Sequence, residues 1–241
     1  METNVFNRIE KKYLITKEQK KNLLKVIKNH MEKDGYYKSE IFNLYFDTDN
    51  YDLIIQSIDQ PEFKEKLRAR SYGGYDRVFL EIKTKLRKKD YNPGYKRRVM
   101  ITRKDFDDLI NNRATILELA SRSIETEDDL QIAKEVEYLI NHFNLKPKIL
   151  IMYHRESYLG EDRLRVTFDE KLKYREDNFS FVKKKSDKIY FKDNRDIIME
   201  VKAHGFLPLW LVKAMSENKV YPQQFGKVGK IFEKIRKEKN V

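Results

Sequence analysis

Residues 63–71 read Phe63-Lys64-Glu65-Lys66-Leu67-Arg68-Ala69-Arg70-Ser71, and they alternate between two kinds of side chain. Every even position carries Lys or Arg, whereas most odd positions are apolar or small. A period of two is typical of a β-strand, because successive side chains point to opposite faces of a sheet. The stretch therefore predicts a strand with one basic face and one face toward a hydrophobic core.

The same alternation recurs along the chain and predicts an antiparallel sheet. We expect strands near Val5–Ile15, Ile41–Asp47, Phe63–Ser71, Val78–Leu86, Tyr95–Ile101, Ile149–Tyr158, Arg163–Asp169 and Ile197–Ala203. Helical spacing predicts helices over Lys17–Asn29, Arg103–Asn111, Ile116–Ala120, Thr126–Asn141, Leu207–Glu217 and Gly226–Lys239. Thr16 and Thr102 stand where N-caps belong, and Asn92-Pro93-Gly94 marks a turn between two strands.

The order of these elements gives the fold class. Strands do not alternate regularly with crossover helices, so we expect an α+β protein with a mostly antiparallel sheet or barrel. No repeat or Gly/Ser-rich linker divides the chain, which predicts a single domain over residues 1–241. A helical insertion is expected at about 103–145 and C-terminal helices at about 206–239.

Composition narrows the classes of partner and of chemistry. The 241 residues carry 51 Lys and Arg against 39 Asp and Glu, a formal net charge of +12 that favours a polyanionic partner. The absence of cysteine excludes disulfides, thiolate nucleophiles and Cys-ligated metals, and the four scattered histidines do not suit a zinc site. No apolar stretch is long enough to span a membrane and no leader is apparent, so we expect a soluble cytoplasmic protein.

Basic residues dominate one face of strand after strand. Besides residues 63–71, the residues that share a polar face are Glu81, Lys83 and Lys85; Lys96 and Arg98; Tyr153 and Arg155; Arg163, Arg165, Thr167 and Asp169; Glu200 and Lys202; and Arg8, Glu10 and Lys12. Such faces are either solvated or filled by a polyanion, and the bias toward one sign favours the polyanion, since like charges on adjacent strands repel. The alternation alone does not say which face points inward.

An ordered series of short motifs covers nearly the whole chain. The series begins at Arg8-Ile9-Glu10-Lys11-Lys12-Tyr13 and continues through Tyr45-Phe46-Asp47-Thr48, Lys66-Leu67-Arg68-Ala69-Arg70-Ser71-Tyr72-Gly73, Glu81-Ile82-Lys83, Lys96-Arg97-Arg98, Tyr153-His154-Arg155, Arg165-Val166-Thr167-Phe168-Asp169, Met199-Glu200-Val201-Lys202 and Phe225-Gly226-Lys227. It resembles the polyphosphate polymerase (VTC-domain) branch of the triphosphate tunnel, or CYTH-like, superfamily. Arg8 departs from the Glu-x-Glu-x-Lys motif of the wider superfamily, as in that branch.

The resemblance implies a closed antiparallel β-tunnel with peripheral helices and a basic interior. It implies transfer of the γ-phosphoryl group of ATP to inorganic polyphosphate, with Mn²⁺ or Mg²⁺ as cofactor. The residues implied to act in catalysis are Lys12, Arg68, Arg70, Lys83, Arg155, Arg165 and Lys227. Those implied to bind substrate are Arg8, Lys66, Lys96, Arg98, Tyr153, Arg163 and Lys202. Glu200 is the first choice as metal ligand, and Glu10 and Glu81 are either further ligands or ion-pair partners of nearby Lys or Arg.

Two other functions remain open from the sequence. The same tunnel would act as a tripolyphosphatase or nucleoside triphosphatase if water were the acceptor. A non-catalytic binder of polyphosphate or nucleic acid is the third hypothesis, although no recognised nucleic-acid-binding motif is present. Nucleic acid is therefore not the expected partner, and docking of a membrane-bound partner on the C-terminal helices is left open.

Overall fold

The computed structural model describes residues 8–59, 61–73, 76–86, 94–122, 124, 126–191 and 197–239. The chain forms two compact units, each assembled from separate stretches of sequence. Unit 1 comprises Met1–Glu40, Tyr153–Lys173 and Ile189–Gly226. Unit 2 comprises Ile41–Met152, Tyr174–Lys188 and Lys227–Val241. We describe each unit by itself.

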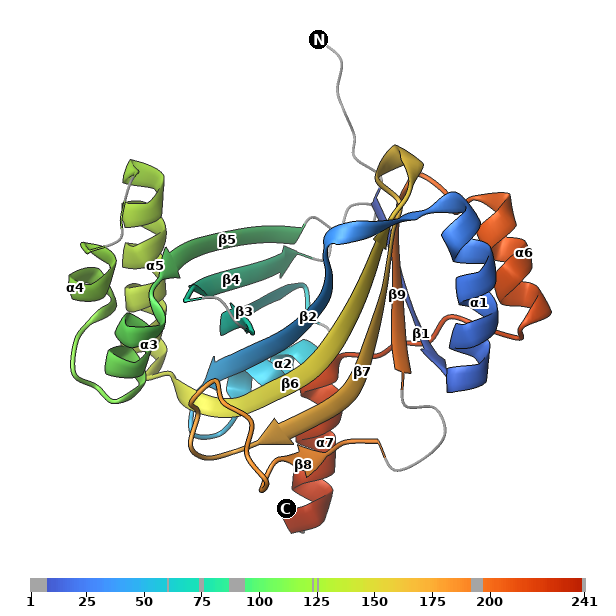
Figure 1. Ribbon diagram of the computed structural model, residues 1–241. Coiled ribbons are helices and arrows are strands. Elements are labelled where there is room, and N and C mark those ends of the chain that lie inside the picture. The colour runs from blue at the N-terminus through green and yellow to red at the C-terminus, as the bar shows by residue number, and fades with distance from the viewer. Residues whose placement is uncertain are drawn as a thin grey trace. The chain divides into compact units, whose positions relative to one another are not determined.

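Antiparallel strands run through both units (Figure 1). The strands are β1 (Arg8–Ile15), β2 (Glu32–Asp47), β3 (Phe63–Tyr72), β4 (Val78–Leu86), β5 (Gly94–Ile101), β6 (Lys146–Leu159), β7 (Arg165–Arg175), β8 (Lys188–Ile189) and β9 (Ile197–His204). Their order is β1-β9-β7-β6-β2-β3-β4-β5, and β8 pairs with β7. The order of the described strands ends at β1 and β5 without a pairing between them, so their hydrogen bonds leave the sheet open. This corrects the expectation of a closed sheet.

The helices are α1 (Lys17–His30), α2 (Asp52–Asp59), α3 (Arg103–Ile110), α4 (Ile116–Ala120), α5 (Glu127–Phe143), α6 (Leu209–Glu217) and α7 (Lys227–Lys239), together with the short 3₁₀ helix η1 (Glu161–Arg163). Thr16 caps α1 in a capping box with Gln19, and the Thr102 hydroxyl accepts the Asp105 N–H at the start of α3. Both threonine caps confirm the expectation from the sequence. None of the described helices is long and apolar enough to cross a membrane.

In unit 1 the apolar face of β1, β9 and β7 packs against α1 and α6. Its buried residues include Tyr13, Val166, Phe168, Met199 and Val201 from the strands and Leu23, Ile27, Leu211 and Ala214 from the two helices. In Figure 1, α1 and α6 lie beside one another, in agreement with the contacts between them. The opposite face of these strands is therefore left for polar side chains.

In unit 2 the apolar face of β2, β3, β4 and β5 packs against helices α3, α4 and α5. Its buried residues include Leu44, Leu67, Leu80, Ile82 and Val99 from the strands and Phe106, Ile116, Ala133 and Val136 from the helices. The basic side chains of residues 63–71 have the opposite parity and lie on the other face. The hydrophobic core thus decides which way the basic face of each unit is turned.

Several elements differ from those expected from the sequence. β2 begins at Glu32 instead of Ile41, and α2 was not expected at all. β7 begins at Arg165, because Arg163 belongs to η1 and has a φ of 59°, which is incompatible with a strand. Residues 5–7 of the first expected strand and Asn92-Pro93 of the expected turn lie outside the described residues.

Candidate functional site

The polar face of unit 2 carries the larger of two groups of expected cations. We call it the unit 2 face and define it by its residues: Asn43 and Tyr45 of β2, Lys66, Arg68 and Arg70 of β3, Glu81 and Lys83 of β4, and Lys96 and Arg98 of β5. The register places these side chains in cross-strand rows, because Tyr45 lies opposite Arg68, Arg68 opposite Glu81 and Glu81 opposite Arg98. Four sequence motifs thus become one surface.

Glu81 is the acidic centre of this face and is fully buried. Its Oε2 lies 2.5 Å from Nη2 of Arg68, and its Oε1 lies 2.6 Å from Nζ of Lys96. Burial raises the pKa of the carboxyl, but the charges of Arg68 and Arg70 and the contact with Lys96 outweigh it and lower the pKa to about 2. Glu81 is therefore an ionised partner of cations, with both oxygens engaged.

A row of three lysines crosses the same face. Lys66 lies opposite Lys83, and Lys83 lies opposite Lys96. Desolvation lowers the pKa of Lys83 to about 8, and the positive charges of Arg68 and Arg70 act in the same direction. Lys83 is an exposed residue of this face. Cross-strand like charges destabilise a sheet, so this row suits an anion that binds across it.

Tyr45 and Asn43 bring polar groups of β2 to the cations of β3. The Nε of Arg70 donates to Oδ1 of the buried Asn43 at 2.8 Å, which fixes the guanidinium. Burial raises the pKa of the Tyr45 phenol, but the charges of Arg68, Lys66 and Lys83 prevail and lower it to about 7. The unit 2 face thus holds a phenol that is partly ionised near neutral pH.

The polar face of unit 1 mixes the two signs more evenly. This unit 1 face is formed by Glu10 and Lys12 of β1, Lys202 and Glu200 of β9, Arg165, Thr167 and Asp169 of β7, and Tyr153, Arg155 and Ser157 of β6. Lys12 lies opposite Glu200, and Glu200 lies opposite Thr167. In the adjacent row Glu10 lies opposite Lys202, which lies opposite Arg165. The opposite charges of Lys12 and Glu200, and of Glu10 and Lys202, stabilise this arrangement, and Lys202 and Arg165 are the like-charge pair in it.

Arg155 is the most firmly positioned cation of the unit 1 face. Its Nε and Nη2 donate to the two carboxylate oxygens of the buried Asp169 at 2.6 and 2.8 Å. Burial lowers the pKa of Arg155, but the interactions with Tyr153 and Asp169 outweigh it and raise the pKa above its usual range. The guanidinium also lies over the ring of Tyr153, 5.5 Å from its centroid. Such a bidentate pair fixes the orientation of the guanidinium plane.

Arg165 is held from β2 and β6. Its Nη2 donates to Oδ2 of Asp34 at 2.7 Å, and its Nε donates to the Ser157 hydroxyl at 3.1 Å. The same hydroxyl donates to Asp34 Oδ2 at 2.9 Å. The side chain of Arg165 remains 41% exposed, so its guanidinium is oriented without being sealed off.

The three expected metal ligands are divided between the units. Glu10 and Glu200 lie on the unit 1 face, where the Lys202 ammonium forms ion pairs with both, whereas Glu81 lies on the unit 2 face. Within the described ranges, no group of three or more His, Cys, Asp or Glu residues is arranged to hold a metal ion. Two carboxylates suit a Mg²⁺ or Mn²⁺ ion that is held mainly by substrate phosphates. Glu10 and Glu200 share the Lys202 ammonium, which such an ion would displace, whereas the buried Glu81 is enclosed by Arg68 and Lys96.

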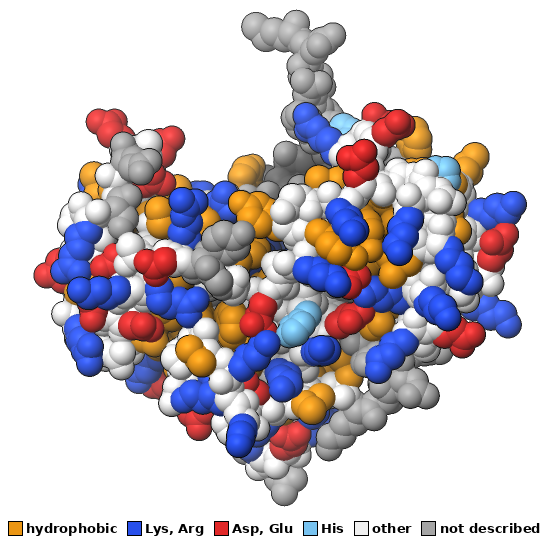
Figure 2. All heavy atoms as spheres, viewed as in Figure 1, with side chains coloured by type: hydrophobic (Ala, Val, Ile, Leu, Met, Phe, Trp, Pro, Cys, Tyr) orange, Lys and Arg blue, Asp and Glu red, His pale blue; other side chains and the backbone are white. Residues whose placement is uncertain are grey.

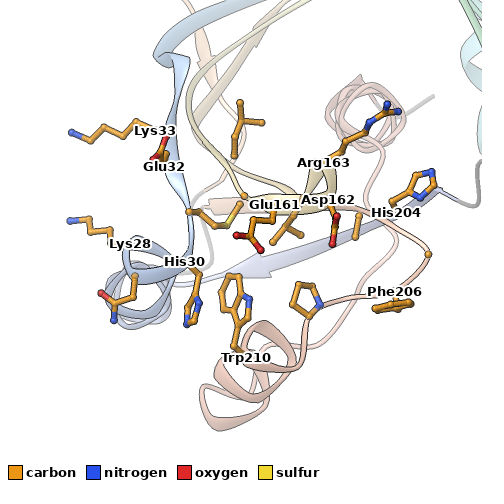
Figure 3. A pocket seen from close by; sticks show the side chains of 18 residues that line it. Lys28, His30, Glu32, Lys33, Glu161, Asp162, Arg163, His204, Phe206 and Trp210 are labelled. Atoms are coloured by element: carbon orange, nitrogen blue, oxygen red, sulfur yellow. The ribbon is translucent and has the colours of Figure 1, made fainter.

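Three expected site residues are not among those that define the two faces. Lys227 is the first residue of α7, in unit 2. Arg8 begins β1 opposite His204, and its side chain lies outside the described part of the structure. Arg163 lines a pocket of about 1480 Å³ in unit 1 (Figure 3), where His30 stacks on Trp210 with ring centroids 4.4 Å apart.

Sequence reasoning gave no role to four residues that hold or complete the two faces. Asn43 and Asp169 orient Arg70 and Arg155, Tyr45 lies among cations, and Thr167 lies beside Glu200. Thr167 and Asp169 have the parity of a predicted basic face, and that was the available signal, whereas no basic face was predicted for the strand that carries Asn43 and Tyr45. Residues of these types occur in most sheets, so a position on the polar face did not distinguish these four from ordinary solvated residues.

The family comparison covers almost the whole chain. The model of the VTC domain matches residues 7–230. The chain belongs to the VTC domain family. This VTC domain has an antiparallel sheet with flanking helices, the fold of the triphosphate tunnel and CYTH-like proteins.

The VTC domain is similar to subunit 4 of the vacuolar transporter chaperone complex of Schizosaccharomyces pombe, with 24% identity over 144 residues. The match covers 55% of this chain but 20% of the relative, so the chain spans about a fifth of the relative's length.

Two solved structures resemble the VTC domain in fold. A Hippeastrum protein described as an adenylyl cyclase candidate with a dominant triphosphatase activity matches with a TM-score of 0.50 and 14% identity, over 91% of each chain. A Pyrococcus horikoshii OT3 protein matches with a TM-score of 0.48 and 12% identity, over 95% of this chain and 99% of the other. At these identities the likeness concerns the fold alone.

Proposed function

We propose that this VTC domain is a polyphosphate polymerase that transfers the γ-phosphoryl group of ATP to the end of a growing polyphosphate chain. The row formed by Lys66, Lys83 and Lys96 carries the proposal, since three directly opposed cations are most stable with a polyanion across them. The family supports the choice of phosphate, because its members include the vacuolar transporter chaperone subunit described above.

The unit 2 face would bind phosphate groups of the triphosphate. Arg68 and Arg70 are held in place by Glu81 and Asn43, so they lose little conformational freedom on binding. Planar guanidinium groups pair well with phosphate oxygens, and Lys83 adds a point charge in the row next to that of Arg68. Lys66, Lys96 and Arg98 extend this basic surface for further phosphates of the substrate.

The unit 1 face would bind phosphates with fewer but better-oriented cations. Arg155 and Arg165 are oriented by Asp169 and Asp34, and Lys12 lies in the row of Glu200. Tyr153 supports the Arg155 guanidinium. We assign Lys202, Lys227, Arg8 and Arg163 to the approach of the substrate, a role that charge alone supports.

Glu200 and Glu10 would hold a Mn²⁺ or Mg²⁺ ion that enters with the substrate phosphates. Such an ion, when bound, neutralises charge that develops on the transferred phosphoryl group. Lys202 pairs with both carboxylates and would compensate their charge before the ion arrives. Glu81 would serve as the ion-pair partner that orients Arg68.

Phosphoryl transfer depends mainly on position and charge, and this suits the residues of the two faces. The acceptor is a terminal phosphate oxygen that is already ionised near neutral pH, so the chain needs no strong general base. Its cations would bring donor and acceptor phosphates together against their mutual repulsion. ATP and inorganic polyphosphate are the proposed partners in the cytoplasm, and further complex subunits belong to the same proposal.

Product analysis tests this function. The purified protein is incubated with ATP and Mn²⁺, and ADP, free phosphate and polyphosphate are measured, the last on a gel. We expect ADP with a ladder of polyphosphate, and we expect Arg70→Ala, Lys83→Ala and Glu200→Ala each to abolish the ladder while circular dichroism stays unchanged. ADP with stoichiometric free phosphate would instead identify a hydrolase, and salt-dependent RNA binding without turnover a polyanion binder.

A further inference from the structure

The hydroxyl of Thr167 lies in the middle of the unit 1 face. Thr167 belongs to β7, and its neighbours Val166 and Phe168 point into the hydrophobic core, so the Thr167 side chain has the parity of the charged face. It lies directly opposite Glu200 on β9, and Glu200 lies opposite Lys12 on β1. Only 3% of the residue is exposed.

This hydroxyl differs from its polar neighbours because it has no partner. In the part of the chain that the structure describes, no group forms a hydrogen bond with Oγ1 of Thr167. Arg165, on the same strand and face, donates to Asp34 and Ser157, while Asp169 accepts from Arg155 and Glu200 pairs with Lys202. Buried hydroxyl groups in proteins are nearly always hydrogen-bonded, so an exception calls for a physical reason.

The surroundings indicate which kind of ligand would supply the missing bond. Lys12, Arg165 and Arg155 add positive charge to this face, whereas a hydroxyl donates a hydrogen bond without adding charge. A neutral donor beside the Glu200 carboxylate suits an anionic oxygen that the nearby cations have already attracted. Phosphate oxygens accept such bonds, and hydrogen bonds to charged acceptors are the stronger ones.

We propose that Thr167 Oγ1 donates a hydrogen bond to an oxygen of a phosphate group held beside Glu200 on the unit 1 face. The inference rests on the proposed function and adds a residue that orients the phosphate through a neutral contact. The unpartnered hydroxyl weakens the free protein, and the bound phosphate satisfies it. Valine has the same branched shape without the hydroxyl, so substitution should affect stability and binding in opposite directions.

The test compares Thr167→Val and Thr167→Ser with the wild type in two measurements. Thermal unfolding is followed without ligand, and binding of tripolyphosphate in the presence of Mn²⁺ is measured by calorimetry. For Thr167→Val we expect a melting temperature a few degrees higher and binding about tenfold weaker, since a hydrogen bond to a charged group is lost. For Thr167→Ser we expect a lower melting temperature, because a buried methyl is removed, but binding within about twofold of the wild type.

In Thr167→Val the melting temperature should rise while the affinity falls, and this combination distinguishes a role in binding from a merely structural one. Equal binding by the wild type and Thr167→Val, or a tenfold loss in Thr167→Ser as well, overturns the assignment of Thr167 and leaves the proposed function standing. A wild type that does not bind tripolyphosphate overturns both the assignment and the proposed function.

Discussion

Tyr45 is a phenol enclosed by cations, and its ionisation can be measured directly. The positive charges of Arg68, Lys66 and Lys83 lower its pKa from 10.0 to about 7, although burial opposes the shift. A group whose pKa is lowered by folding stabilises the protein fully above the unfolded pKa, and this contribution is lost as the pH falls through the folded value. Tyr45 should therefore stabilise the fold increasingly between about pH 7 and pH 10.

We expect the difference in 295 nm absorbance between the wild type and Tyr45→Phe to show a phenolate step near pH 7. Tripolyphosphate should move that step to higher pH, because a bound polyanion screens the three cations. The matched control is Tyr138→Phe, which removes an exposed phenol of α5 and should leave the step near pH 7 in place. A wild type with no step below pH 9 would contradict the proximity of Tyr45 to these charges.

At the residue scale, the sequence predicted faces better than it predicted contacts. Parity put Lys66, Arg68 and Arg70 on one side of a strand, and the apolar core behind that strand confirms the division. It did not reveal that Asp169 clamps Arg155, since that contact joins β7 to β6. Partners across strands depend on register, which turns and packing decide.

Asp47, the last residue of strand β2, caps the start of helix α2. The carboxylate accepts backbone N–H groups of Thr48, Leu53 and Ile54 at 2.8, 2.9 and 2.8 Å. Burial raises its pKa, while these three hydrogen bonds act in the opposite direction. The two bonds to Leu53 and Ile54 satisfy donors in the first turn of α2, which would otherwise be buried without partners.

We expect Asp47→Ala to lower the free energy of unfolding by about 2 to 3 kcal/mol, because buried N–H groups lose their acceptor. Asp47→Asn retains one acceptor oxygen and should lose less. The control is Asp49→Ala, two residues away, where an exposed carboxylate pairs with Lys146 and Lys148. A pair as exposed as this one contributes little to stability. Urea unfolding measures all three variants, and equal losses for Asp47→Ala and Asp49→Ala would refute the capping role.

At the element scale, helices with their own caps were predictable and α2 was not. Thr16 and Thr102 precede clear helical spacing, and both act as N-caps. α2 has eight residues and is capped by Asp47, which belongs to a strand and lies five residues before the helix begins. The first half of β2 was missed because residues 32–40 are mostly polar or charged and lack the alternation of a half-buried strand.

At the scale of the whole molecule, each unit repeats one design of an apolar core behind a charged face. The core of unit 1 lies between β1, β7, β9 and helices α1 and α6, and the core of unit 2 lies between β2–β5 and helices α3–α5. Elsewhere, Lys and Arg side chains are spread among acidic ones over the surface seen in Figure 2. On the C-terminal helix, for example, Lys230 pairs with Glu233 and Lys239 with Glu176. A net charge of +12 therefore does not by itself say where a polyanion binds.

Two alanine variants with the same net charge separate a site from a general attraction. Arg70→Ala and Lys237→Ala each lower the formal net charge from +12 to +11. Arg70 is fixed by Asn43 on the unit 2 face, whereas Lys237 is exposed in the last turn of α7. Exposed charges are strongly screened by salt, with a Debye length of about 8 Å at 0.15 M, so an exposed cation that makes no contact with the ligand adds little to binding. If the polyanion binds at a local site, the two variants should therefore differ in affinity although their net charge is the same.

We expect Arg70→Ala to weaken tripolyphosphate binding about tenfold or more at 0.15 M salt, since a positioned guanidinium is lost. Lys237→Ala should bind within about twofold of the wild type under the same conditions. Calorimetric titrations at two salt concentrations measure both effects. Lowering the salt lengthens the screening distance and should bring the two variants closer together. Equal weakening by both at 0.15 M would mean that total charge, and not the arrangement of Lys66, Arg68, Arg70 and Lys83, attracts the polyanion.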